Sequence, residues 1–240
     1  MKKTIAIIGS SGAIGNSICE VLLNEYPIKK LYKFSRKIQS KDTDKIKNIA
    51  IDIEDENSIK ESLKDIPRDV KFDLIFVATG LLHNENEIFP EKSIKDINID
   101  MFQKVLLVNA IGPALIGKYF IPLLKKDNKS VFAFLSAKVG SISDNKIGGW
   151  YSYRASKAAL NQIIKNFSIE IRRNNNNAIF VGLQPGTVKS FLSKPFQKNV
   201  NSQTLFTPNY SAKKLLKLID SLDHEDSGKL FSWNGEEIQP

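Results

Sequence analysis

Short apolar runs alternate along the chain with longer segments in which apolar residues recur every three or four positions. The short runs are rich in β-branched and aromatic residues and end at turn-forming or charged residues, a pattern typical of buried strands. They predict seven strands, at 4–9, 30–35, 48–53, 73–80, 131–137, 178–186 and 229–233. The helical periodicity between them predicts helices near 14–25, 56–65, 98–125, 151–173 and 211–222.

This alternation predicts an α/β fold with one doubly wound parallel sheet of about seven strands. Runs that are apolar throughout suit a sheet covered by helices on both faces. No repeat, linker or shift in composition divides the 240 residues, so we expect a single domain over 1–240. Two irregular segments, 81–97 and 187–209, follow strands at the carboxyl edge of the sheet, where open α/β sheets bind ligands.

Charge and cysteine content narrow the class of protein. The net charge of +9 is spread along the chain, which favours a solvated lysine-rich surface over a nucleic-acid-binding face. The single cysteine, Cys19, is expected to be a buried filler, and no Cys/His cluster has metal-ligand spacing, so we expect an intracellular, metal-free protein. The apolar run at the N-terminus is too short for a secretory signal, and no stretch approaches the roughly 18 apolar residues of a membrane span. We therefore expect a cytoplasmic protein without a membrane or nucleic-acid partner.

The sequence IAIIGSSGAIG places Gly9, Gly12 and Gly15 between the first predicted strand and the first predicted helix. A tight strand-to-helix turn aims free backbone N–H groups at a ligand, and side chains there would block the approach of a pyrophosphate. The spacing predicts a Rossmann-like dinucleotide site. The alternative is a strand-to-helix turn that binds nothing.

The second predicted strand ends in Ser35, Arg36 and Lys37, where an acidic residue would favour NAD. A hydroxyl and two cations fit the 2′-phosphate of NADP, although Arg36 could also be an ordinary exposed charge. Asp52, after the third strand, either accepts a hydrogen bond from the adenine amine or caps a helix that begins near Glu54.

Tyr153 and Lys157 lie four positions apart in a predicted helix and therefore share a face. A cation within about 4–6 Å of a phenol favours the phenolate and lowers its pKa from near 10 toward working pH. Such a pair can act as a general acid and base toward a carbonyl oxygen. In isolation, the same spacing is also common among ordinary helix residues.

In combination, these features resemble the short-chain dehydrogenase/reductase family over essentially the whole chain, and in particular the branch of C-factor signalling proteins and small carbonyl reductases. The resemblance is carried, in this order along the chain, by GSSGAIG, Asp52-Ile53, VNAIG at 108–112, FLSAKVGS, YRASK at 153–157 and QPGTVKS at 184–190.

The resemblance implies that Tyr153 is the proton donor, and that Lys157 lowers its pKa and binds the nicotinamide ribose. It implies that the backbone of Asn109 holds a water linked to the lysine, with a helix-interior kink residue as the alternative. It further implies homodimers or homotetramers, and the cations after the second predicted strand make NADP(H) the expected cofactor. The implied cofactor contacts are Gly9, Ser11, Gly12, Ile14, Gly15, Ser35, Arg36, Asp52, Ile53, Ala78, Gly80, Tyr153, Lys157, Pro185, Gly186, Val188 and Ser190.

The sequence departs from the family pattern at two places. Ala137 occupies the usual position of the substrate-orienting serine, so this hydroxyl comes from Ser141 or Ser143, from Ser136, or is missing. VATG at 77–80 replaces the familiar NNAG, and we expect cofactor contact there through the backbone.

Aromatic residues near these motifs predict an apolar substrate pocket. Trp150 and Tyr151 either form a wall of it or pack at a helix start, and His83 lies near the expected substrate mouth or is merely structural. One apolar set in segment 187–209 is expected to form either a lid that excludes water or a subunit contact: Phe191, Leu192, Phe196, Leu205 and Phe206.

We therefore expect an NADP(H)-dependent carbonyl reductase or alcohol dehydrogenase acting on a small hydrophobic ketone or aldehyde. The competing hypothesis is a dinucleotide-binding signalling or regulatory protein of C-factor type with little turnover, which Ala137 favours.

Overall fold

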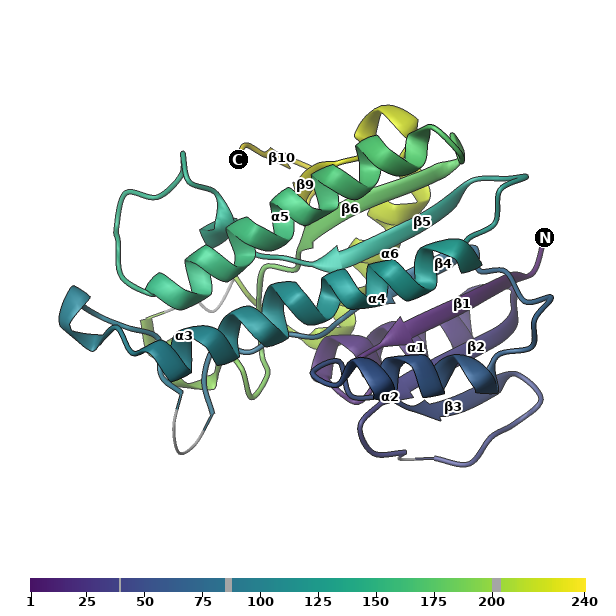
Figure 1. The fold of residues 1–240 in the computed structure, drawn as a ribbon, viewed down its shortest axis with the longest axis horizontal. Helices are drawn as coiled ribbons and strands as arrows, with labels where there is room; N and C mark the ends of the chain where they lie inside the picture. Colours follow the sequence, from purple (N-terminus) through teal and green to yellow (C-terminus); the bar gives the residue numbers. More distant parts are fainter. Residues whose placement is uncertain (39, 85–87, 200–203) are drawn as a thin grey trace.

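The computed structural model describes residues 1–38, 40–84, 88–199 and 204–240. In this part of the chain, one eight-stranded sheet has the order β10-β9-β6-β5-β4-β1-β2-β3 (Figure 1). Its strands are β1 (Lys3–Ile8), β2 (Ile28–Ser35), β3 (Ile46–Ala50), β4 (Leu74–Val77), β5 (Ser130–Leu135), β6 (Ala178–Gln184), β9 (Lys229–Ser232) and β10 (Glu237–Ile238). All pairs are parallel except β9 with β10, which confirms the doubly wound α/β prediction.

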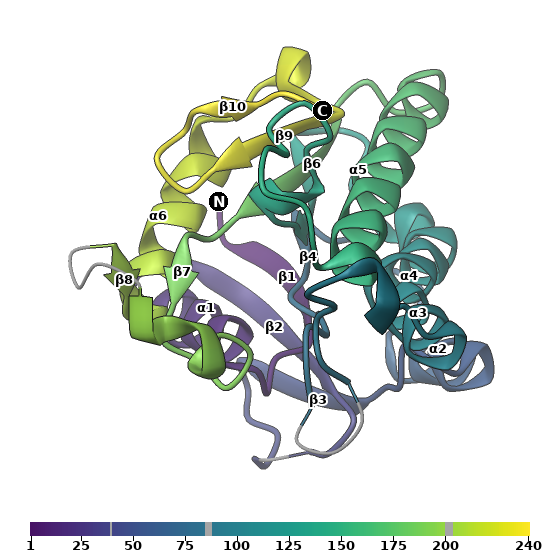
Figure 2. The ribbon, with the colours of Figure 1, turned by 90° about the vertical axis from the view of Figure 1, so that its left-hand side faces the viewer.

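Helices cover both faces of the sheet, as Figure 2 shows. One face carries α1 (Ala13–Glu25) and α6 (Pro208–Ser221); the other carries α2 (Glu56–Ser62), α3 (Ile99–Leu106), α4 (Gly112–Phe120) and α5 (Tyr151–Arg172). Each layer has its own buried core, one built around Phe76 and Leu215 and the other around Phe132 and Phe180. The strands are fully apolar because both of their faces are packed against helices.

The structure adds strands to the seven that were predicted. β10 pairs with β9 through a turn at Asn234 and Gly235, and Gly235 has a φ of 90°. An Asn-Gly pair is a hairpin signal, but a two-residue strand has no apolar run to mark it. A separate parallel pair joins β7 (Thr187–Val188) to β8 (Leu205–Phe206) inside the segment expected to be irregular.

The helix predicted over 98–125 is interrupted. Between α3 and α4 the backbone forms a π-helical turn, η3 (Leu107–Ile111), and a 3-10 turn, η4 (Ile121–Leu123), follows α4. Pro113 has no N–H to donate to the carbonyl of Asn109, four residues earlier, so the regular ladder cannot pass through this point.

The same helical run, Ile99–Leu123, is long and apolar enough to cross a membrane by length and composition alone. The expectation that no stretch reaches this limit was therefore wrong. In the fold this run lies on the sheet, and Ile116 and Phe120 are fully buried. Burial of one face against the sheet explains much of its apolar composition.

Candidate active site

The glycine-rich turn joins β1 to α1 at the carboxyl edge of the sheet. Gly9 has a φ of +84°, which an L side chain rarely adopts, and a Cβ on Gly15 would collide with the carbonyl oxygen of Gly9. Gly12 is the N-cap of α1, with no side-chain capping bond and no acidic residue in the first turn. The N–H groups of this turn are thus open to an anion, and the turn fits the pyrophosphate of a dinucleotide.

The end of β2 lies against this turn, because the N–H groups of Gly9 and Ser10 both donate to the carbonyl of Phe34, at 2.9 and 3.0 Å. Ser35 donates its hydroxyl proton to the carbonyl of Lys37 at 2.7 Å. Arg36 is exposed beside it. The arrangement places a cation one residue after the strand end, within the region where a nucleotide ribose would follow the pyrophosphate.

The structure tests one of the two roles expected for Asp52, that of a helix cap. Asp52 accepts a hydrogen bond from the N–H of Glu54 at 3.1 Å, but α2 begins at Glu56 and its N-cap is Asp55, which accepts from Asn57 at 2.9 Å. The prediction that Asp52 caps this helix was wrong, since the helix begins two residues later than expected. The contact with adenine remains a prediction. Ile53 is buried, and a Cβ on Gly112 of α4 would lie 2.9 Å from its carbonyl oxygen.

The residues that follow β4 connect the glycine-rich turn to α5. A Cβ on Gly9 would lie 3.0 Å from the carbonyl carbon of Ala78, and a Cβ on Gly80 would lie 3.7 Å from the Nζ atom of Lys157. Between them, the Oγ1 atom of Thr79 is buried and has no hydrogen-bond partner among the described residues. The expected close backbone approach at Ala78 and Gly80 is therefore available, and Thr79 adds a hydroxyl that sequence reasoning missed.

Tyr153 and Lys157 lie one turn apart on α5 and are almost completely buried, with exposed fractions of 8% and 2%. The Nζ atom of Lys157 lies 5.8 Å from the centre of the Tyr153 ring and donates to the carbonyl of Leu135, at the end of β5, at 2.9 Å. An ammonium group has three donors, so this bond leaves two for other partners.

The pKa shift of Tyr153 has the opposite direction to the predicted one. Burial raises the pKa of Tyr153 to about 12 and lowers the pKa of Lys157 to about 8. Desolvation disfavours the charged form of each group, and here it outweighs attraction between the ammonium and a phenolate. Tyr153 is therefore a protonated phenol at neutral pH, ready to donate rather than accept.

Asn109 lies in the π-helical turn and is fully buried. Its side chain accepts from the N–H of Leu81 at 2.7 Å and donates to the carbonyl of Leu81 at 2.8 Å. It also donates to the hydroxyl of Ser156, which in turn donates to the carbonyl of Tyr153. The kink that was kept as an alternative is present, and the side chain joins segment 81–97 to α5; the proposed water on its backbone remains a prediction.

The three candidate serines occupy different surroundings. Ser136 is buried and donates to the side chain of Asn161, on α5, at 2.6 Å. Ser141 is buried; its hydroxyl lies 3.3 Å from that of Ser143 and accepts from the N–H of Asp144. Ser143 is exposed. No described residue forms a hydrogen bond with the Tyr153 hydroxyl, so none of the three serines is joined to it directly.

The turn after β6 carries the remaining predicted cofactor contacts. Gly186 has a φ of +78°, and a Cβ there would lie 2.6 Å from the ring of Phe206. Pro185 accepts from the hydroxyl of Ser211 on α6, and Val188 is buried in β7. Ser190 is bonded to Ser193 through side-chain and backbone contacts, so its hydroxyl belongs to a local network.

The apolar residues of segment 187–209 do not pack together in one cluster. Phe206, in β8, packs against Tyr210 and Trp233, away from the other aromatics. Phe191 stacks on His83 with ring centres 5.1 Å apart, and the Nε2 atom of His83 lies 2.9 Å from the Phe191 carbonyl. Within the described part of the segment, Phe191 and Phe196 therefore reach the residues near Tyr153, whereas Phe206 does not.

An aromatic enclosure, formed by His83, Trp150, Tyr153, Phe191 and Phe196, results from these contacts. Phe196 contacts both His83 and Trp150, with ring centres 5.8 and 5.0 Å apart, and Trp150 contacts Tyr153 edge-on at 6.1 Å. Trp150 thus packs against Tyr153 at the start of α5, as one of the two expectations had it, and its place in a pocket wall remains a prediction; Tyr151 makes no ring contact within the described residues.

One buried residue, Glu91, was missed by sequence reasoning, and the contact that holds a second one, His83, could not be predicted. His83 was kept as either structural or functional, but its position under Phe191 depends on a contact 108 residues away. Glu91 has an exposed fraction of 1% and accepts hydrogen bonds from the start of α5. Neither contact leaves a local sequence signal.

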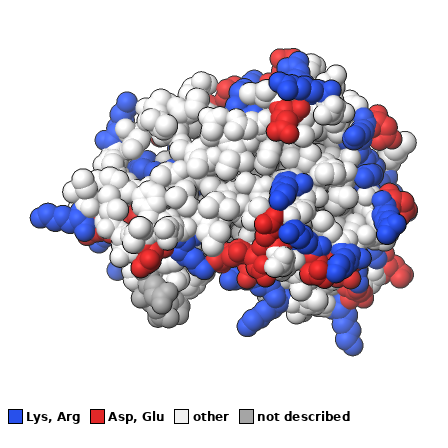
Figure 3. Space-filling view, in the orientation of Figure 1, with Lys and Arg blue, Asp and Glu red and all other residues white. Residues whose placement is uncertain are grey.

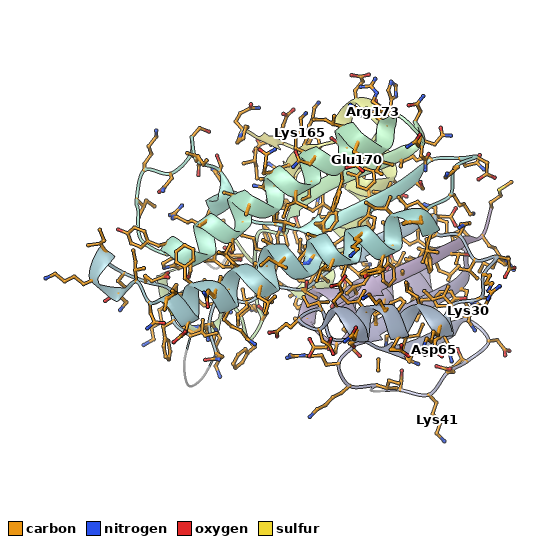
Figure 4. All side chains as sticks on the ribbon, viewed as in Figure 1. Lys30, Lys41, Asp65, Lys165, Glu170 and Arg173 are labelled. Carbon is orange, nitrogen blue, oxygen red and sulfur yellow. The ribbon has the colours of Figure 1, made fainter. Side chains whose placement is uncertain are left out.

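The opposite end of α5 is polar and distant from the site. Figure 4 labels Lys165 and Glu170 in the C-terminal half of this helix and Arg173 at its C-cap, away from the carboxyl edge where Tyr153 lies. Figure 2 shows the loops before α3, before α5 and after β6 gathered over that edge. The chemistry-bearing residues are thus concentrated at one end of the sheet. No group of three or more metal-ligating side chains occurs within the described ranges.

The chain is similar to several known proteins. A 1-hydroxy-2-glutathionyl-2-methyl-3-butene dehydrogenase from Rhodococcus sp. (strain AD45) is 30% identical over 170 residues, which is 71% of this chain and 69% of that protein. The C-signal protein of Myxococcus xanthus is 30% identical over 146 residues, covering 61% of this chain and 82% of its own. A crystal structure of NADPH-bound carbonyl reductase from chicken fatty liver superposes with a TM-score of 0.86 at 21% identity, covering 100% of this chain and 99% of that one.

A family model matches most of the chain. The model described as short chain dehydrogenase matches residues 3–201, which include the glycine-rich turn, Asn109 and the Tyr153–Lys157 pair. The chain therefore belongs to the short-chain dehydrogenase family.

Proposed function

We propose that this protein is an NADP(H)-dependent carbonyl reductase or alcohol dehydrogenase acting on a small hydrophobic ketone or aldehyde. The observation that carries the proposal is that the dinucleotide turn, the segment after β4 and Lys157 are neighbours along the carboxyl edge of the sheet. The segment after β4 lies close to Gly9 of the dinucleotide turn at one end, and close enough to Lys157 at the other that a Cβ on Gly80 would be 3.7 Å from the ammonium. A nicotinamide cofactor, when bound, supplies or accepts the hydride.

The residues of this chain would handle the proton. Tyr153 is protonated at neutral pH, as a phenol with an ordinary pKa of 10 already is, and burial, which raises its pKa to about 12, extends this state to higher pH; it can therefore donate to a carbonyl oxygen during reduction. Lys157 keeps two N–H donors beyond its bond to Leu135 and supplies a positive charge against the phenolate that remains. The pKa of Lys157 of about 8 means that this charge is present at neutral pH and is lost above it.

The substrate class follows from the enclosure around Tyr153. The ring of Trp150 contacts the Tyr153 ring directly, and a chain of ring contacts leads from Trp150 through Phe196 to His83 and Phe191. These rings favour an apolar or aromatic carbonyl compound. The choice of NADP(H) is supported by Arg36 and by the NADPH named for the chicken enzyme.

An oligomer is part of the proposal. Helices α3, α4 and α5 form a continuous layer, and the face that they present in Figure 3 has few charged side chains across its middle. Exposed isoleucines in this layer include Ile99 on α3, Ile111 in the turn η3 and Ile169 on α5. A second copy of the chain packed there would cover them.

A regulatory protein with little turnover is the second candidate. Ala137 occupies the position of the substrate-orienting serine, and the hydroxyls of Ser136 and Ser141 are bonded elsewhere. The relative named C-signal in Myxococcus xanthus is consistent with this candidate.

The deciding experiment titrates NADPH and NADH by fluorescence and then assays a panel of apolar aldehydes and ketones with wild type and Tyr153→Phe. We expect NADPH to bind more tightly, wild type to turn over at least one carbonyl, and Tyr153→Phe to lose roughly 10²- to 10⁴-fold in kcat with its NADPH affinity retained. Tight NADPH binding with no turnover of any carbonyl would support the regulatory candidate.

A further inference from the structure

The helix that carries Tyr153 begins without a cap of its own. Its N-cap residue, Trp150, makes no side-chain capping bond, and the first turn contains no acidic residue. By contrast, α2, α3 and α6 begin with Asp55, Asn98 and Thr207, and each of these side chains accepts from a first-turn N–H. The first N–H groups of any helix need partners, so α5 must obtain its partner elsewhere.

Glu91 provides that partner from a distant segment. Its two carboxylate oxygens both lie 3.2 Å from the backbone N of Ser152, and its carbonyl oxygen accepts from the N–H of Trp150 at 2.5 Å. The residue is almost completely buried, and within the described ranges no Lys or Arg forms an ion pair with it. A buried carboxylate at this position is stabilised by the positive end of the helix dipole.

Trp150 is held in an unfavourable backbone conformation by the same contact. Its φ and ψ are 52° and 43°, and no other non-glycine residue in the described ranges has a positive φ. A bulky residue in this region stores strain that surrounding contacts must maintain, and such strain is concentrated at functional sites. In this conformation the indole ring of Trp150 contacts the rings of Tyr153 and Phe196.

We infer that Glu91 is a positioning residue for the reaction: it clamps the start of α5 so that Trp150 and Tyr153 face the substrate in one fixed arrangement. Glu91 touches neither the phenol nor the expected cofactor edge; it acts through the backbone of residues 150 and 152. The inference rests on the proposed function, because it assigns a role within that active site.

An ordinary stabilising cap is the competing explanation. It would lower the thermal stability when Glu91 is removed but leave the turnover of each folded molecule unchanged. Asp55 offers a matched control, since it is also a carboxylate that caps a helix, and α2 lies beside β3 at the far side of the sheet order.

The kinetic test compares Glu91→Ala, Glu91→Gln and Asp55→Ala with a carbonyl substrate that wild type reduces. We expect Glu91→Ala to lower kcat roughly 10-fold or more, because small misplacements of reacting groups are costly, while the Kd for NADPH stays within about 2-fold. Glu91→Gln retains an acceptor oxygen and should recover to within about 3-fold of wild type. Asp55→Ala should lower Tm and leave kcat and KM unchanged. Should Glu91→Ala fail to fold, Glu91→Asp, which shortens the reach by one methylene, replaces it with the same expected loss.

A second test does not depend on turnover. The chain has two tryptophans, so a Trp233→Phe background leaves Trp150 as the sole indole. In that background Glu91→Ala should shift the Trp150 emission to longer wavelength and increase its quenching by acrylamide, whereas Glu91→Gln and Asp55→Ala should not. Unchanged emission together with unchanged kcat in Glu91→Ala would overturn the inference. If wild type reduces no carbonyl compound, the proposed function fails, and the emission alone decides whether Glu91 holds Trp150.

Discussion

The cofactor side and the substrate side of this site are built in different ways. On the cofactor side, the turn from β1 to α1 is determined locally, because its glycines, strand and helix are consecutive in sequence. On the substrate side, Tyr153 is held by contacts from segments that are distant in sequence, including Leu81, Asn109 and Glu91. A short motif can therefore specify where a nucleotide lies, whereas the position of a reacting group depends on the whole fold.

The largest effect is expected on the substrate side, where Asn109 stabilises the fold. Asn109→Ala removes both side-chain bonds to Leu81 and leaves two partly buried backbone groups unpaired, so the free energy of unfolding should fall by about 2–4 kcal/mol. Urea unfolding measures this change. Asn109→Asp retains the acceptor for the Leu81 N–H but loses the donor, and should fall between alanine and wild type; a loss below about 1 kcal/mol for alanine would contradict the assigned role.

The next effect belongs to the cofactor side and should leave the substrate side intact. Arg36→Ala should weaken NADPH binding roughly 10- to 100-fold, because a charge-assisted hydrogen bond contributes about 1.5–3 kcal/mol, and leave NADH binding unchanged. Fluorescence titration with both nucleotides checks this result. Lys41→Ala removes an exposed cation beyond the strand end (Figure 4) and serves as the control for general charge. Equal losses for both nucleotides would show that Arg36 does not read the 2′-phosphate.

A smaller effect is expected from the buried charge of Lys157. Its folded pKa of about 8 lies below the unfolded value of 10.5, and this difference corresponds to about 3 kcal/mol of penalty at neutral pH. Lys157→Met removes the penalty together with the bond to Leu135, so at pH 7 the inactive variant should be about 1–2 kcal/mol more stable than wild type.

The difference in stability between wild type and Lys157→Met should also depend on pH. Between pH 8 and 10.5 the unfolded state binds more protons at this lysine than the folded state, so the stability of wild type rises with pH relative to Lys157→Met. Urea unfolding at pH 7 and at pH 9.5 should therefore show a gap that narrows or reverses. A variant that is less stable than wild type by a constant amount at both pH values would contradict the assignment.

The smallest effect is expected at Thr79, where the two sides meet. Thr79→Val replaces a buried hydroxyl that lacks a partner with a methyl group, so the protein without cofactor should gain about 0.5–1 kcal/mol. Thr79→Ser, which keeps the hydroxyl, is the matched control. A loss of stability in the valine variant would mean that the hydroxyl has a partner in solution, and a simultaneous loss of NADPH affinity would identify the cofactor as its partner.

The sequence allowed the fold and the cofactor side to be predicted because both depend on local or periodic patterns. Continuous apolar runs marked the central strands, and glycine spacing marked the turn whose geometry Gly9 and Gly15 require. β10 was missed because two residues make no periodic pattern. The π-helical turn was left as an alternative at Asn109, although Pro113 was its visible cause.

The substrate side could be predicted only in part. The spacing of Tyr153 and Lys157 indicated a shared face, but the pKa shift of the phenol depends on burial, which no local spacing reveals. The partners of Glu91 and His83 lie about 60 and 108 residues away. Their roles arise only when loops from different strands meet at the carboxyl edge.

The bond pair between Asn109 and Leu81 has a consequence for how such proteins diversify. A carboxamide that pairs with both the N–H and the carbonyl of one residue does what a neighbouring strand would do, and it fixes the chain just beyond β4. Insertions or deletions placed between that anchor and Glu91 would reshape the mouth of the pocket while the root of the loop, and the ammonium next to it, stay where they are. Substrate specificity can therefore change while the residues that transfer the proton keep their positions.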